Sequence, residues 1–449
     1  MSFKKGFSSI SGGKDLKEII HEASVTFILR VVGLITSYVF NIIFARIYGA
    51  DVIGIFGLVL SVHGIFSLLA NAGSQTSVVR FIAQYGNNKD YGEVSNIYAK
   101  YLKALIPLSL LFTLLFYLYS PFFAETIFRN ELLIIPFRII AFTVPLSVFF
   151  TINIAALRGL KEIGKAFVFQ ALTPVFNLIG MIFITYTIVR HDLVPITAQA
   201  ISTFLVALIS YILWKRVMAR KTNKSTIKVE YKTSYKNILN VSLPMMITAG
   251  MFYILGWTDT LMLGIFRTEA EVGIYRIALK VALFTSFTLS AVNSIAGPKF
   301  SELYWSGDKR RLKATIQNSA QLIFFTSLPI FFMLVFFSKE ILWLFGERFI
   351  EGRVVLIILS IGQFINAAFG SVGLLLDMTG NQKIFRNAVI LGAVLNIILN
   401  ALLIPKFGIS GAAIATAAST IVWNLKTAIS VYKIFGYWVG YKPTLKIIS

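Results

Sequence analysis

The residues best suited to chemistry in this sequence are charged side chains that interrupt long apolar stretches. Arg276 and Lys280 lie four residues apart, which places both on one face of a helix, and Arg30 interrupts an earlier stretch. A charge near the centre of a membrane-spanning helix costs roughly 2.5–3.5 kcal/mol on insertion scales, so such a residue should face a cavity or a partner. These cations are therefore candidates to line a cavity, where they could bind an anionic group or hold helices together in an ion pair.

Two further titratable residues have two interpretations each. Asp259 lies in the outer half of the stretch before Arg276, where it could form a buried ion pair with Arg276 or Lys280 or bind a coupling ion in the cavity. His63 is either a proton relay or a hydrogen-bonded packing residue. Polar amides that could line a sugar path or bridge helices are Asn71, Gln170, Asn177, Gln363, Asn366 and Asn396.

The composition identifies the elements that must position these side chains. Hydrophobic residues make up 57% of the chain, charged residues make up 14%, and the mean hydropathy is +0.77, which is typical of an all-α polytopic membrane protein. Because a span needs about 20 apolar residues, we expect about twelve transmembrane helices. They are predicted near 25–45, 52–73, 102–120, 132–154, 166–188, 196–214, 241–264, 272–296, 316–337, 354–376, 386–404 and 411–431.

The second half of the chain repeats the first with a shift of 219 residues. Gly54-Ile55-Phe56 is matched by Gly273-Ile274-Tyr275, and Arg80-Phe81 is matched by Lys299-Phe300. The repeat predicts two six-helix bundles, 25–214 and 241–435, related by a pseudo-twofold axis along the membrane normal. A duplicated membrane bundle is typical of a transporter. The same shift places Gly57 opposite Arg276 and Ser61 opposite Lys280, so the predicted cavity is asymmetric.

The Lys and Arg residues behind the net charge of +22 are concentrated in segments predicted to lie on one side of the membrane. With a cytoplasmic N-terminus, 29 of the 42 Lys and Arg residues fall in inward segments and nine in outward segments. By the positive-inside rule, both termini of this multi-pass protein are predicted to be cytoplasmic, and the charge need not indicate nucleic-acid binding. Residues 1–24 are then a cytoplasmic segment, with Asp15–Ser24 as a candidate interfacial helix. Residues 215–240 form a basic cytoplasmic linker, and 436–449 form a cytoplasmic tail.

Several motifs together resemble the polysaccharide-biosynthesis flippases of the multidrug/oligosaccharidyl-lipid/polysaccharide exporter superfamily. They are DTLMLGIFRTEAEVGIYRIALK from Asp259, PKFSELYWSGD from Pro298, LDMTGNQK from Leu376 and PKFGISGAAIATAAS from Pro405. The resemblance implies a V-shaped pair of bundles in the cytoplasmic membrane that moves lipid-linked oligosaccharide, on a polyprenyl phosphate or diphosphate carrier, to the outer leaflet by alternating access. A glycan polymerase and glycosyltransferases are candidate partners, and H⁺ or Na⁺ is the candidate coupling ion.

Two alternatives remain at this point. One is a cation-coupled multidrug exporter of the same superfamily, which Asp259 mildly favours and a cationic cavity opposes. The other is a membrane glycan polymerase or ligase, which normally needs a large outer loop that is not visible in this sequence. The sequence contains no cysteine and no recognisable P-loop, metal-ligand cluster or nucleophile–base pair, so we expect no enzyme, cofactor or metal site.

The predicted topology can be tested with reporter fusions. Fusions after residues 225 and 449 should report the cytoplasm, and a fusion after residue 268 should report the exterior, because the charge bias sets the orientation. An exterior signal from the fusion after residue 225 would contradict the two-bundle arrangement.

Overall fold

The computed structural model describes residues 13–222 and 233–439, without the side chains of residues 13–27, Arg30 and Gln170. Within these ranges the chain is helical and contains no strand. Its α-helices are α1 (Gly13–Asn71), α2 (Ser74–Asn87), α3 (Tyr91–Leu118), α4 (Ile134–Ala141), α5 (Val144–Gly159), α6 (Ile163–Thr187), α7 (Val194–Thr222), α8 (Tyr235–Phe266), α9 (Glu269–Ala282), α10 (Phe287–Trp305), α11 (Lys309–Phe336), α12 (Ser338–Trp343), α13 (Arg353–Phe369), α14 (Val372–Met378) and α15 (Gln382–Phe435). Short 3-10 or π turns, η1 (Phe122–Ile127), η2 (Glu131–Leu133), η3 (Leu283–Ser286) and η4 (Glu347–Gly352), join some of them.

The predicted fold of about twelve spans is confirmed. Nine helical segments among the described residues are long and apolar enough to cross a membrane, and a bent pair, Glu131–Ala141 with Val144–Gly159, makes a tenth. Two of the nine are interrupted by a non-helical glycine: Val31–Asn87, which contains most of α1, at Gly49 (φ 78°), and α15 at Gly408 (φ 56°). Glycine adopts this left-handed conformation without steric cost. Counting α1 and α15 as two spans each brings the total to the predicted twelve.

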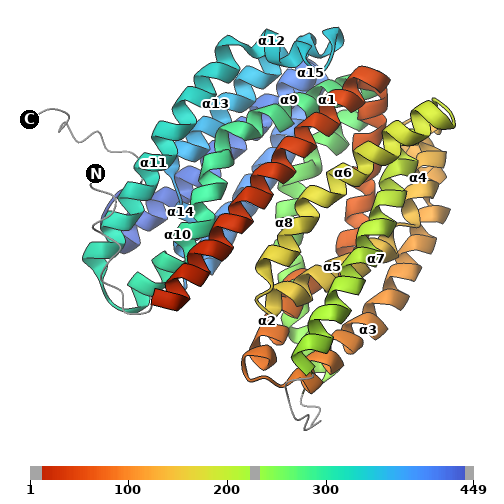
Figure 1. The fold of residues 1–449 in the computed structure, drawn as a ribbon. Helices are drawn as coiled ribbons and strands as arrows, with labels where there is room; N and C mark the ends of the chain where they lie inside the picture. Colours follow the sequence, from red (N-terminus) through yellow and green to blue (C-terminus); the bar gives the residue numbers. More distant parts are fainter. Residues whose placement is uncertain (1–12, 223–232, 440–449) are drawn as a thin grey trace, which may run out of the picture.

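The helices form two groups that meet at one end of the molecule and diverge toward the other (Figure 1). They meet where α1 bends at Gly49, and they diverge toward the end that carries α2 and the α5–α6 turn (Figure 1). The part of α1 before Gly49 and helix α8 lie between the two groups (Figure 1). In α1, Tyr38 donates a hydrogen bond to the Lys280 carbonyl at 2.6 Å, and in α8 Ser242 donates one to Ser77 of α2 at 2.7 Å.

The two bundles touch most closely at a crossing between the second half of α1 and α9. A Cβ added to Gly54 would overlap the backbone carbonyl of Glu269, and a Cβ added to Gly273 would overlap the carbonyl of Ala50. Gly54 and Gly273 are equivalent positions of the repeat, as are Ala50 and Glu269. The pseudo-twofold axis therefore passes between the two glycines, where small residues allow two helices to approach.

Polar contacts close the same end, which is the predicted outer end. Arg46 donates to the carbonyls of Trp343 and Leu344 at 2.6 and 2.9 Å. Arg348 forms an ion pair with Asp51 at 2.6 Å, although both side chains are more than half exposed and such pairs contribute little on their own. The described structure is thus closed at the predicted outer end.

The predicted domain limits can be placed on these elements. Asp15–Ser24 is helical as the first part of α1, and its position at a membrane surface stays a prediction. Helix α7 ends at Thr222 and helix α8 begins at Tyr235, so both extend into the predicted linker 215–240. The central linker residues 223–232 lie outside the described ranges. Helix α15 ends at Phe435, and residues 440–449 of the predicted tail lie outside the described ranges. The domain limits themselves stay a prediction.

The glycine crossing predicts a stability effect. Gly54→Ala and Gly273→Ala should each destabilise the protein by about 1–3 kcal/mol, because overpacking against a backbone atom cannot be relieved by a rotamer change. Gly180→Ala is the matched control, since its new Cβ would lie at an ordinary 3.6 Å from Ala198. Thermal unfolding followed by tryptophan fluorescence measures the effect. Equal unfolding temperatures for the three variants would contradict the assigned crossing.

Candidate functional site

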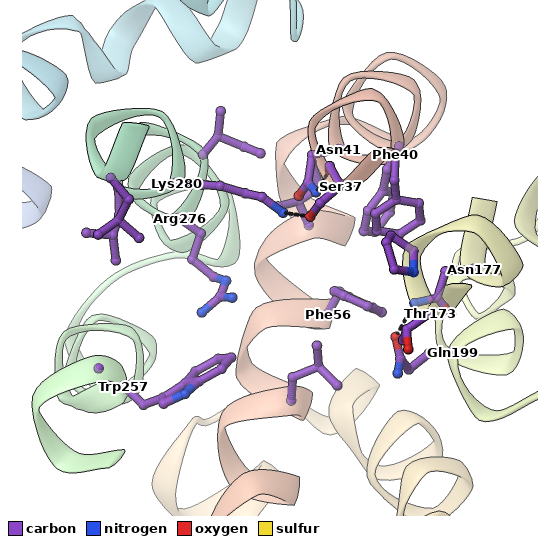
Figure 2. Close-up of a pocket in the computed structure, with 18 residues that line it drawn as sticks. Ser37, Phe40, Asn41, Phe56, Thr173, Asn177, Gln199, Trp257, Arg276 and Lys280 are labelled. Atoms are coloured by element: carbon purple, nitrogen blue, oxygen red, sulfur yellow. Dashed lines mark hydrogen bonds between the residues drawn. The ribbon is translucent and has the colours of Figure 1, made fainter. Parts of the chain in front are cut away.

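A cavity of about 500 Å³ lies between the two bundles, and we call it the Arg276 cavity (Figure 2). Helices α1, α6 and α7 of the first bundle, and α8, α9 and the first residue of η3 of the second, supply its lining residues. Both Arg276 and Lys280 line this cavity, and no Asp or Glu of the described residues is in its lining. The four-residue spacing therefore places both cations on one face of α9, as the sequence predicted, and makes the cavity cationic.

The Arg276 guanidinium is held without a carboxylate partner among the described residues. It lies 4.3 Å from the centre of the Trp257 ring and donates a hydrogen bond to Thr260 at 3.2 Å. Its stem crosses the pseudo-twofold axis onto Gly57, where any Cβ would overlap the Arg276 side chain. A cation over an aromatic face is stabilised by the ring quadrupole, which leaves most guanidinium donors unused.

Lys280 lies one turn further along α9. Its ammonium donates to Ser37 of α1 at 2.8 Å and lies 6.0 Å from the centre of the Tyr38 ring. Figure 2 shows the two cations extending from α9 toward the space beside α1. Asn177 and Gln199 lie across the cavity, and the Asn177 amide donates a hydrogen bond to Gln199 at 2.7 Å. The Asn177 Oδ1 atom is buried and has no partner among the described residues. This arrangement offers cations on one wall and amides on another.

Asp259 does not meet these cations. Its carboxylate accepts hydrogen bonds from Tyr275 at 2.7 Å and from Thr416 at 2.5 Å, and from the amides of Asn396 and Asn400 at 3.1 and 2.6 Å. Among the described residues it forms no ion pair with Arg276 or Lys280, so the structure does not contain the ion pair that was one of the two alternatives. The physical reason is helical geometry, since Trp257 and Asp259 are two residues apart and point to opposite sides of α8.

The other predicted residues are distributed more widely. His63 lies 2.9 Å from the Thr143 hydroxyl and 3.2 Å from the Ser67 hydroxyl, which is the hydrogen-bonded packing arrangement, and its role in coupling stays a prediction. Asn366 accepts from Asn424 at 2.9 Å inside the second bundle, and Gln363 is buried on the same helix. Neither lines the Arg276 cavity. Arg30 lies on α1, but its side chain is outside the described part of the structure.

Trp257 and Gly57 are functional candidates that the residue types alone did not reveal. Trp257 is one of six tryptophans and carried no signal in the sequence. Gly57 could have been found, because the shift of 219 places it opposite Arg276 and a glycine there leaves room for a long side chain.

Comparisons with known proteins agree with this fold. The model of the family described as polysaccharide biosynthesis protein matches residues 19–304, and the MatE family model matches residues 244–402. A probable low-salt glycan biosynthesis flippase of Haloferax volcanii is 27% identical over 402 residues, which cover 88% of this chain and 80% of that protein. A lipid II flippase of Bacillus subtilis is 21% identical over 462 residues, covering 94% and 82%.

A solved structure has the same fold. An inward-facing multidrug resistance MATE family transporter superposes with a TM-score of 0.74 over 91% of this chain and 98% of that chain, at 16% sequence identity. At this identity the likeness concerns the fold alone.

Proposed function

This chain belongs to the polysaccharide biosynthesis protein family, and we propose that it is a flippase for lipid-linked oligosaccharide. It would act in the cell membrane with both termini in the cytoplasm, moving a glycan on a polyprenyl phosphate or diphosphate carrier to the outer leaflet. Its role is transport and not catalysis. Partners would be a glycan polymerase and the glycosyltransferases that build the substrate.

The observation that carries this proposal is the cationic Arg276 cavity between the bundles. A phosphate that crosses a membrane loses its hydrogen bonds to water and needs protein hydrogen-bond donors in their place. Charge-assisted hydrogen bonds from Arg and Lys are the strongest of these. Arg276 and Lys280 have hydroxyl and aromatic neighbours but no carboxylate neighbour among the described residues, so their charge is available to a ligand. The Asn177–Gln199 pair across the cavity offers amide groups that suit sugar hydroxyls.

Alternating access would move the substrate between leaflets. The described structure is closed at the predicted outer end by the Gly54–Gly273 crossing and by Arg46 and Arg348. Opening that end while the other closes would carry the head group across. The buried Asp259 carboxylate, surrounded by hydroxyl and amide groups, is the proposed site for a coupling H⁺ or Na⁺.

A cation-coupled multidrug exporter is the second candidate. The MatE match over residues 244–402 and the buried Asp259 favour it. The charge of the cavity opposes it, because a site for cationic drugs needs acidic or unoccupied aromatic groups, whereas the Trp257 face already carries Arg276.

Neutralising the cavity cations tests the proposal. Arg276→Gln and Lys280→Gln should each lower transport at least about tenfold, because a hydrogen bond to a charged group contributes roughly 1.5–3 kcal/mol. Arg276→Lys and Lys280→Arg should retain part of the activity. Lys339→Gln, an exposed cation at the predicted outer end, is the matched control. Transport is measured as surface glycan in a complemented deletion strain, with membrane protein level measured in parallel.

The deletion strain itself separates the two candidates. A flippase deletion should accumulate lipid-linked oligosaccharide on the inner leaflet without gaining drug sensitivity. Normal surface glycan together with increased drug sensitivity would overturn the flippase assignment in favour of the exporter.

A further inference from the structure

A second cavity, of about 720 Å³, lies toward the predicted cytoplasmic end, and we call it the Arg158 cavity. Three arginines line it: Arg80 of α2, Arg158 of α5 and Arg386 of α15. The first two belong to the first bundle and the third to the second bundle, and α8 supplies most of the remaining wall. Among the residues that the structure describes, no Asp or Glu lines it.

These guanidinium groups are not engaged elsewhere in the described chain. All three side chains are exposed, and none forms an ion pair or side-chain hydrogen bond within the described residues. Here, arginines from opposite bundles face one polar space that also contains Gln75, Thr76 and Asn240.

Helix α8 connects this cavity with the Arg276 cavity. Phe252 lines the Arg158 cavity, and Gly256 and Trp257 line the Arg276 cavity. Four residues of helix rise only about 6 Å, so one turn of α8 separates the two linings. Helix α8 thus places the two sets of cations on neighbouring stretches of one helix.

We propose that the Arg158 cavity is a first docking site for the phosphate or diphosphate of the lipid-linked substrate, before the group moves to Arg276 and Lys280. This inference rests on the proposed function. Arg80, Arg158 and Arg386 would replace part of the hydration of the anion while the lipid tail remains in the bilayer. Transfer along α8 then takes the anion from one set of cations to the next.

Binding of inorganic diphosphate and farnesyl diphosphate to the purified full-length protein tests this site. Calorimetry should show two binding events in the wild type. The double variant Arg80→Gln/Arg386→Gln should weaken one event at least tenfold and leave the other, whereas Arg276→Gln should weaken the event that the double variant retains. The double variant Arg80→Lys/Arg386→Lys should retain both events, and Arg310→Gln, an exposed cytoplasmic-end arginine that lines neither cavity, is the matched control.

The outcomes separate this site from the proposed function. If the deletion strain accumulates lipid-linked oligosaccharide but Arg80→Gln/Arg386→Gln binds both probes as the wild type does, the docking site is wrong and the function stands. If the double variant loses one binding event but the deletion strain has normal surface glycan, the site stands as an anion site and the function is wrong. Equal weakening by Arg310→Gln would reduce the effect to general surface charge and overturn the site.

A separate observation, the repeat itself, concerns closure of the predicted cytoplasmic end. Arg158 and Asp377 are equivalent positions, 219 residues apart, with opposite charge. The turns that follow them also correspond, because Lys161 with φ 65° and Gly380 with φ 83° are equivalent left-handed residues. Asp377 lies in a cavity that shares Thr248, Phe252 and Arg386 with the Arg158 cavity, and its burial raises the pKa of the carboxyl to about 6.

At the closed end, the equivalent residues Gly54 and Gly273 meet across the pseudo-twofold axis. At the other end, the equivalent residues Arg158 and Asp377 line neighbouring cavities, and by the same symmetry they should meet when that end closes. We infer that Arg158 and Asp377 form an ion pair between the bundles in the state closed to the cytoplasm. The pair would replace the substrate anion on Arg158 after the anion has moved on.

The absence of cysteine from the sequence makes this inference directly testable. In Arg158→Cys/Asp377→Cys, oxidation should form a disulfide, which requires Cα atoms within about 7 Å, and should stop transport until a reductant is added. Each single-cysteine variant is the control. The exchange Arg158→Asp/Asp377→Arg should recover at least half of the transport that either single charge reversal loses.

Two results would overturn the ion pair. Absence of the disulfide together with no recovery in the charge exchange would show that the residues do not approach. A disulfide without recovery in the charge exchange would show that they approach without pairing.

Discussion

The close crossing of α1 and α9 is the contact on which the rest of the structure depends. Gly54 and Gly273 let two backbones touch at the pseudo-twofold axis, and no larger residue fits at either position without displacement. The same face of α1 continues through Gly57 and Gly64, where Arg276 and Tyr253 of the second bundle fit. A stripe of small residues thus sets the distance between the bundles and admits the side chains that line the Arg276 cavity.

The duplication supplies a symmetric frame, and the side chains make an asymmetric site within it. Equivalent positions carry Gly57 and Arg276, and Ser61 and Lys280, so both cations of the Arg276 cavity come from the second copy. An amphiphilic substrate has a charged head and an apolar tail, and a symmetric cavity would offer both copies the same chemistry. The absence of a side chain at Gly57 is part of the site, because the Arg276 stem occupies that space.

The sequence predicted the spans, the repeat and the shared face of Arg276 and Lys280, because hydropathy and helical spacing determine them directly. The suggested pairing of Asp259 with these cations failed for a specific reason. The prediction considered the position of Asp259 along the helix axis but not the side of the helix that it faces. Residues two positions apart on a helix point to nearly opposite sides. Trp257 and the hydroxyl and amide groups around Asp259 were beyond prediction, because they depend on how α8 packs against α9 and α15.

The way in which Arg276 is held explains why a buried cation can be a binding group and not a structural one. A buried charge with a carboxylate partner is largely neutralised, and a ligand must compete with that partner. The face of Trp257 stabilises Arg276 without neutralising it, and Thr260 occupies a single donor. A phosphate that binds there, as proposed, would gain the remaining donors without breaking an ion pair. Asp259, held by four hydrogen bonds on the far side of α8, keeps its negative charge out of the same space.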